Sequence, residues 1–172
     1  MKLNPDKDVL KEIKETTINY ENENIEQKLN RLGIEERERM IKSWESDNKR
    51  GKKPDVISTN RCANILIENM NFLLFDEEEN TKLAMYQEDR GVYTQKTSLI
   101  KRIISYLEPK HNSNKADDVI YHIRNRTEIK EKTNSPYLIP VNNGVFNRKT
   151  KQLENFSPNY VFTSKIDTNY ID

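Results

Sequence analysis

Glycine occurs at only four positions in this chain, 33, 51, 91 and 144, and this scarcity restricts the folds open to it. A phosphate-binding loop or a dinucleotide-binding turn needs several closely spaced glycines, because backbone N–H groups must close around the phosphates. None of the four glycines precedes a Lys-Ser or Lys-Thr pair. The sequence therefore excludes an ATPase site within this chain.

Composition points to a folded protein with a lean core, since 34% of the residues are hydrophobic and 33% are charged. The formal net charge is +1, so any binding to nucleic acid must come from local patches. No apolar run is long enough to span a bilayer, and the first residues have no signal-peptide core. We therefore expect a cytoplasmic protein with no membrane partner, and the many Lys, Asn, Ile and Glu residues suggest an AT-rich bacterial host or its phage.

Residues 1–54 read as a helical arm followed by a basic linker. Asn4 and Pro5 can begin a first helix, a second is expected to end at Gly33, and a third to begin near Glu35. Segment 48–54 then breaks the helical pattern with a glycine, a proline and four basic residues, which is typical of an exposed linker. We therefore predict a domain boundary after residue 54.

Residues 55–172 predict an α+β domain in which amphipathic helices pack with short antiparallel strands and hairpins. Helical spacing of apolar residues follows a cap at Ser58 or Thr59, and two further helices are expected before Pro109 and after an Asn114 cap. A strand is expected to begin at Phe72, and a hairpin around residues 88–91. The last third alternates apolar runs with turn signals, the strongest being Asn-Asn-Gly at 142–144.

No catalytic or metal site is predicted. His111 and His122 lie eleven residues apart without a paired cysteine, and the acidic run 76–79 is expected to be solvated. A polymerase-type primase needs acidic residues on adjacent strands for two divalent ions, and no Asp-x-Asp occurs on a strand-like run. The lone Cys62 lies among apolar residues and is expected to be buried and inert.

The function left open by this reasoning is the binding of nucleic acid, because three basic clusters could contact phosphates. They lie in the linker, after the helix that ends near residue 124, and beyond the Asn-Gly turn; one more arginine stands at the hairpin tip, where it could act as a basic wing. Charge on exposed turns is also routine, and the flanking Tyr86 and Tyr93 are expected to pack rather than bind. The candidate DNA-binding residues are Lys49, Arg50, Lys52, Lys53, Arg90, Arg124, Arg126, Arg148, Lys149 and Lys151.

Segment 138–166, LIPVNNGVFNRKTKQLENFSPNYVFTSKI, carries the most telling pattern. A strand and an Asn-Gly turn lead to a second strand, a Lys-Thr turn at 149–150 and a Ser-Pro-x-Tyr-x-Phe-Thr stretch at 157–163. With the preceding elements, over roughly residues 58–166, this resembles the domain immediately before the superfamily-three helicase motor in phage, plasmid and poxvirus primase-helicases. Asn147 departs from the acidic residue expected after the strand.

The resemblance implies a role in DNA replication. It implies a full-length helicase or primase that forms a ring around DNA, in which this domain links an upstream module to the motor and no catalytic site lies in this chain. ATP and Mg would then bind only to the motor domain, whose sequence would be expected after residue 172, and the full-length protein would be a homo-oligomer. Two alternatives stay open: a stand-alone winged-helix-like DNA-binding regulator, and a purely protein–protein interaction module. Tight sequence-specific binding would favour the regulator, whereas weak binding of any strand favours the helicase context.

Overall fold

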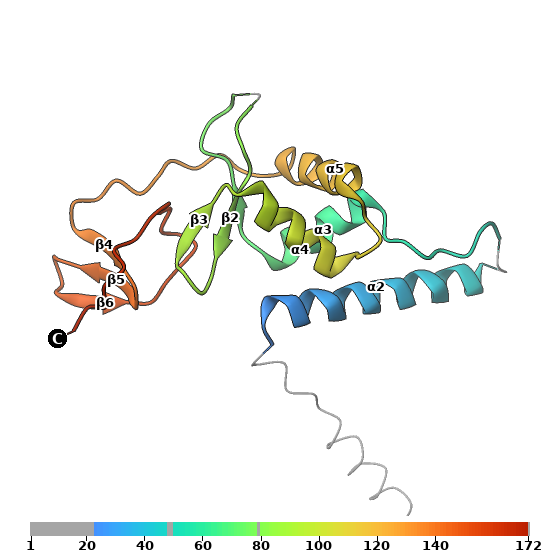
Figure 1. Ribbon diagram of the computed structural model, residues 1–172, viewed down its shortest axis with the longest axis horizontal. Coiled ribbons are helices and arrows are strands. Elements are labelled where there is room, and N and C mark those ends of the chain that lie inside the picture. Colours follow the sequence, from blue (N-terminus) through green and yellow to red (C-terminus); the bar gives the residue numbers. More distant parts are fainter. Residues whose placement is uncertain (1–22, 48–49, 79, 172) are drawn as a thin grey trace, which may run out of the picture.

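The computed structural model describes residues 23–47, 50–78 and 80–171, so the helix predicted from Asn4 and Pro5 lies outside the described residues. The described part has four helices and two three-stranded antiparallel sheets, which confirms the predicted α+β class (Figure 1). The helices are α2 (Ile25–Ser46), α3 (Thr59–Asn69), α4 (Thr97–Leu107) and α5 (Ser113–Arg124). The first sheet consists of β1 (Phe72–Leu73), β2 (Ala84–Gln87) and β3 (Val92–Thr94). The second sheet consists of β4 (Leu138–Val141), β5 (Gly144–Asn147) and β6 (Gln152–Glu154).

Helix α2 begins at a capping box, in which Asn24 and Gln27 each bond the other's backbone N–H, and continues without a break through Gly33. The prediction that a helix ends at Gly33 is therefore wrong. Gly33 is needed for a different reason: a Cβ at this position would lie 2.1 Å from the carbonyl oxygen of Leu107. Glycine thus lets α2 cross close to the end of α4.

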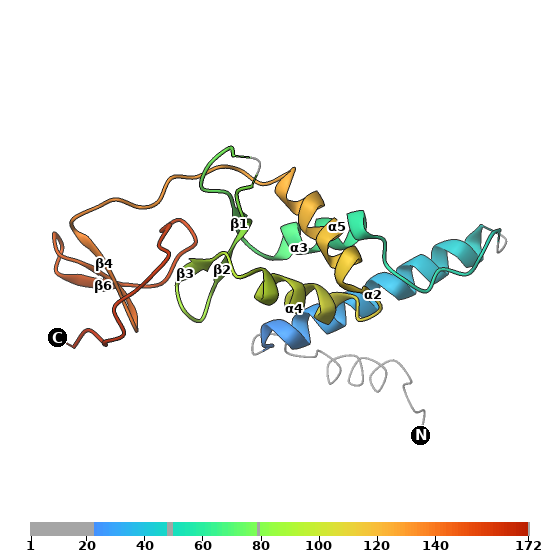
Figure 2. The same cartoon turned by 45° about the horizontal axis from the view of Figure 1, so that its top comes forward.

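The main core lies between α2, α3, α4 and α5, with α2 running along one side of the other three helices (Figure 2). Leu29 of α2 is fully buried in this core beside residues such as Leu66, Ile104 and Ile123. The helical core therefore includes residues that precede residue 54. The domain boundary predicted after residue 54 stays a prediction. Cys62 is buried as predicted, and burial raises the pKa of its thiol to about 12, which leaves it unreactive.

Three predicted helix boundaries after residue 54 can be compared with the structure, and two of them agree. Ser58 accepts a hydrogen bond from the Arg61 N–H, which confirms the cap of α3, and α4 ends at Leu107, just before Pro109. Helix α5 begins earlier than predicted, because Asn112 rather than Asn114 accepts the capping bond, from the Lys115 N–H at 3.0 Å. The predicted start of this helix was therefore two residues late.

The predicted hairpin is confirmed as β2 and β3, with Gly91 in the left-handed region at φ +66°. Tyr86 and Tyr93 face each other across it, with ring centroids 5.1 Å apart and both side chains buried, as expected for packing residues. A Cβ on Gly91 would lie 2.0 Å from the ring of Phe156, so the hairpin tip is also where a later segment docks.

The second sheet is joined to this hairpin by the chain that follows β6. The Tyr93 N–H donates to the Phe162 carbonyl at 2.7 Å, and the Tyr93 hydroxyl donates to the Pro158 carbonyl at 2.8 Å. Val92, Val145 and Phe162 form a small shared core beneath these bonds. As a result β4–β6 occupies one end of the molecule, and the connection between α2 and α3 lies at the other (Figure 1).

The Asn142-Asn143 turn joins β4 to β5 as predicted, with Val141 paired to Gly144. Gly144 has φ +154°, and a Cβ there would lie 2.5 Å from the carbonyl oxygen of Glu154 on the next strand. We expect Gly144→Val to lower the free energy of unfolding by about 1 to 3 kcal/mol, because both the backbone angle and the contact oppose a side chain. Urea denaturation measures this, with exposed Asn142→Ala as control. A midpoint equal to that of the control would contradict this account of the turn.

Candidate nucleic-acid interface

The predicted basic residues do not converge on one face. Arg50, Lys52 and Lys53, here termed the linker surface, lie in the connection between α2 and α3 at one end of the molecule (Figure 1). The turn surface lies between β5 and β6 at the opposite end, and the predicted cluster after α5 lies between the two. The turn surface consists of Arg148, Lys149 and Lys151. Lys49 lies outside the described residues.

Charge compensation separates the strong candidates from the weak ones. The side chains of the linker and turn surfaces are all exposed, and within the described ranges none of them forms a salt bridge. Lys149 places its ammonium 5.0 Å from the centre of the Tyr137 ring, which attracts the cation through its π-face without carrying a negative charge. These two surfaces can therefore offer their charge to phosphates.

The arginines near the end of α5 are engaged within the protein. Arg126 donates to the side-chain oxygens of Asn64 and, at 3.1 Å, Asn60, both on α3. Arg124 is half-buried and lines a small cavity with Ile100 and Ile120. Both arginines therefore lie beside side chains of other helices, and these neighbours could not be predicted from the sequence. A phosphate would have to compete with these contacts.

Arg90 lies exposed at the tip of the β2–β3 hairpin, as predicted. It directly follows the exposed acidic residues Glu88 and Asp89, and within the described ranges it forms no salt bridge. Arg90 belongs to neither the linker surface nor the turn surface.

Buried carboxylates hold several other arginines in structural roles. Glu36 of α2 is 5% exposed and accepts hydrogen bonds from Nε of Arg39 and from both Nε and Nη2 of Arg61, each at 3.0 Å. The bonds from Arg39, and then those from Arg61, lower the pKa of Glu36 to about 2, so that it stays ionised at neutral pH. This network fixes α2 to α3 and withdraws Arg39 and Arg61 from any binding role.

An aromatic residue stands beside each of the two uncompensated surfaces, and sequence reasoning assigned no binding role to either. Trp44, near the end of α2, donates its indole N–H to the carbonyl of Gly51 in the linker at 3.2 Å. Tyr137 is 47% exposed beneath Lys149. Aromatic faces among cations are a recurring means of holding nucleic-acid strands. The available signal was that Trp44 comes just before the basic run, but its place on an apolar helical stripe indicated packing.

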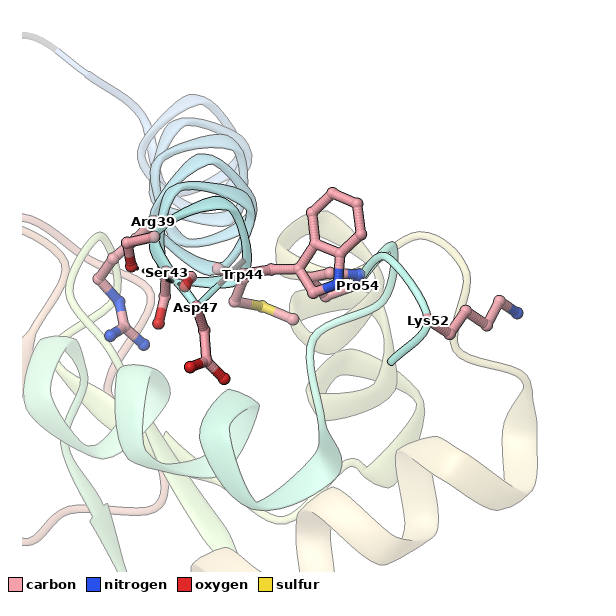
Figure 3. A pocket seen from close by; sticks show the side chains of 8 residues that line it. Arg39, Ser43, Trp44, Asp47, Lys52 and Pro54 are labelled. Atoms are coloured by element: carbon pink, nitrogen blue, oxygen red, sulfur yellow. Dashed lines mark hydrogen bonds between the residues drawn. The ribbon is translucent and has the colours of Figure 1, made fainter. Parts of the chain in front are cut away.

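Trp44 also lines an open hollow of about 660 Å³ between the end of α2 and the linker (Figure 3). Trp44 and Pro54 lie together on its linker side, while Arg39, Ser43 and Asp47 lie on the other side. Lys52 extends from the loop beyond Pro54. The hollow therefore combines an aromatic ring, polar groups and a basic rim.

The described segments hold neither a cluster of metal ligands nor a helix that could span a membrane. They contain no group of three His, Cys, Asp or Glu side chains placed to hold a metal ion. Among these residues no helix is both long and apolar enough to cross a bilayer. The predicted lack of a cofactor in this chain stays a prediction.

A family model defines the class of this α+β domain. The model described as D5 N terminal like matches residues 59–172, which span α3 through β6 and the chain beyond. This is the domain that precedes the superfamily-three helicase in primase-helicases.

The chain belongs to this D5 N-terminal-like family, which confirms the resemblance drawn from the 138–166 pattern. No curated protein matches the chain. The match includes the turn surface, whereas α2 and the linker surface precede it.

Proposed function

We propose that this chain is a non-catalytic module of a DNA-replication primase-helicase, and that it binds DNA weakly and without sequence preference. Membership of the D5 N-terminal-like family carries the replication context. The exposed charge of the linker and turn surfaces supports the DNA contact, because their lysines and arginines form no salt bridge with any described residue and can neutralise phosphates.

Weak binding follows from the charge distribution. The net charge of the chain is +1, and the two basic surfaces lie at opposite ends, so few phosphates are neutralised at either one. Contacts between lysine or arginine side chains and DNA phosphates carry no direct sequence information. In a ring of several copies, together with the motor domain of the same polypeptide, many modest contacts would add up to tight binding.

Catalysis belongs to the motor in this proposal, and ATP and Mg would bind there rather than here. We expect the purified chain to release no phosphate from ATP, because it lacks the glycine-rich loop that would cradle the phosphates. A phosphate-release assay tests this against a heat-denatured sample of the same protein. Turnover above that background would show that a catalytic site has been overlooked.

Removing either basic surface should weaken DNA binding to all sequences alike. We expect the double variants Lys52→Ala/Lys53→Ala and Arg148→Ala/Lys149→Ala each to lower affinity several-fold and to reduce the salt dependence by about one to two phosphate contacts. Fluorescence anisotropy of labelled oligonucleotides of unrelated sequence measures both effects.

The matched control removes two exposed lysines that are already paired with acids. Lys110 lies 3.4 Å from Asp55, and Lys130 lies 3.5 Å from Glu128, so Lys110→Ala/Lys130→Ala changes the net charge equally while keeping every basic residue of the two surfaces. If this control weakened binding as much as the test variants, only overall charge would matter and the two surfaces would have no special role. Loss of binding to one sequence alone would instead favour a DNA-binding regulator, and no binding by the wild type would favour a protein-interaction module.

A further inference from the structure

We infer that the linker surface binds single-stranded DNA by stacking an unpaired base on Trp44, with the flanking cations holding the phosphates. This inference rests on the proposed function and names the form of DNA and the site. Trp44 is the sole tryptophan of the chain, and it lies just before the most basic run in the sequence.

The ring and the cations are held together by one hydrogen bond. The indole N–H of Trp44 donates to the Gly51 carbonyl at 3.2 Å, and Gly51 stands between Arg50 and Lys52. Gly51 has φ +75°, a left-handed conformation that turns the loop back toward the helix. The basic loop is thereby tied to the aromatic ring, so a base on the ring would have cations within reach of its neighbouring phosphates.

The ring is also kept in place by what surrounds it. Trp44 is half-buried, and it lines the hollow together with Met40 and Pro54 (Figure 3). A side chain held in this way loses little conformational entropy on binding. The hollow, at about 660 Å³, is open to solvent and has ample room for a nucleobase.

The side of the hollow opposite Trp44 would set the orientation of a bound DNA strand. Ser43 and Asp47 lie there, and their oxygens can accept hydrogen bonds from the amino and ring N–H groups of a base. The Asp47 carboxylate repels phosphate, whereas Arg50, Lys52 and Lys53 attract it from the rim. A bound strand would therefore turn its base inward and its backbone outward.

This arrangement favours single strands over duplex. Bases within a duplex are stacked on each other and paired, so their faces are closed to a protein ring. Stacking on an aromatic side chain contributes to binding only where a base is unpaired. Duplex DNA could use the cations of the linker surface but not Trp44.

Tryptophan fluorescence tests this site directly, because all indole emission from the chain comes from Trp44. We expect single-stranded oligothymidylate at low salt to quench this emission, with the same midpoint as the anisotropy of a labelled oligonucleotide. A duplex of equal length is expected to change the anisotropy without comparable quenching. Trp44→Ala should weaken single-strand binding about 5- to 100-fold, and Trp44→Phe less, because phenylalanine keeps a ring for stacking.

Tyr121→Ala is the matched control, since it removes a 62% exposed aromatic side chain from α5, away from the linker. Thermal melting by circular dichroism checks that each variant folds. If Trp44→Ala does not fold, the quenching of wild-type emission still tests the inference. Single-strand binding with unchanged Trp44 emission, or a folded Trp44→Ala variant that binds single strands as tightly as the wild type, would overturn the inference and leave the proposed function intact, as would equal quenching by duplex. If anisotropy detects no binding of either form, the proposed function fails and the inference with it.

Discussion

Glu108→Ala is expected to lower the free energy of unfolding by about 3 to 5 kcal/mol, because it removes the acceptor at the centre of a buried network. Glu108 is 1% exposed and accepts the N–H of Ile57 at 2.9 Å, the N–H of Lys110 at 3.1 Å and Nη1 of Arg37 at 3.2 Å. Ile57 is fully buried, so its N–H would be left without a partner in an apolar site. Urea denaturation followed by circular dichroism measures the loss.

Asp55→Ala is the control for this prediction, since Asp55 forms an exposed ion pair with Lys110 at 3.4 Å. An exposed pair contributes about 0 to 1 kcal/mol, so this variant should remain close to the wild type. Similar losses in the two variants would show that the Glu108 network contributes no more than a surface pair, and that α2 and the segment before α3 are held by other means.

Gly33→Ala is expected to destabilise the fold by about 3 kcal/mol, and the sign of this effect is diagnostic. In an exposed helix, alanine is more stable than glycine by about 1 kcal/mol. At this crossing, however, the added Cβ would lie 2.1 Å from the Leu107 carbonyl oxygen, a backbone atom that cannot turn aside. Helix α2 would have to move away from α4, which would also strain the bond from Arg37 to the same carbonyl.

Asn30→Ala provides the comparison, because Asn30 is an exposed position of the same helix and should be unchanged or slightly stabilised. Thermal unfolding of both variants decides the matter. A Gly33→Ala protein at least as stable as the wild type would mean that α2 does not pack closely against α4.

Local signals were enough to predict much of the fold. The hairpin of β2 and β3 and the turn before β5 depend on Gly91 and Gly144. Both glycines have positive φ angles, which tight turns often require and which glycine adopts most easily. The apolar spacing of α3, α4 and α5 likewise follows from each segment alone. These elements were predictable because their causes lie within a few residues of each other.

The error at Gly33 arose because a distant residue decides the outcome, and the error at the start of α5 arose because two nearby asparagines can both cap a helix. Glycine is a common helix terminator, but Gly33 is needed because the Leu107 carbonyl, far along the chain, leaves no room for a Cβ. Asn112 and Asn114 are both able to cap a helix, and the chain reversal after α4, where the His111 N–H bonds the Glu108 carbonyl at 3.1 Å, places Asn112 at the start. Sequence spacing cannot distinguish such cases.

The same limit applies to the candidate interface. Its cations could be identified from the sequence, but whether each is compensated depends on partners elsewhere in the chain. Arg126 meets Asn60 and Asn64 across more than sixty residues, whereas Lys52 and Lys149 form no salt bridge within the described part of the chain. Trp44 was placed on an apolar stripe, and only the folded loop brings Gly51 to its indole N–H.

The salt dependence of DNA binding tests the central proposal most directly. Anisotropy of labelled single- and double-stranded oligonucleotides should show weak binding at about 50 mM salt that falls steeply by about 200 mM, with a logarithmic slope equal to a few phosphate contacts. The slope should decrease when either the linker surface or the turn surface is neutralised. Failure of the wild-type chain to bind either form at concentrations on the order of 100 μM, or binding that does not respond to salt, would contradict the account.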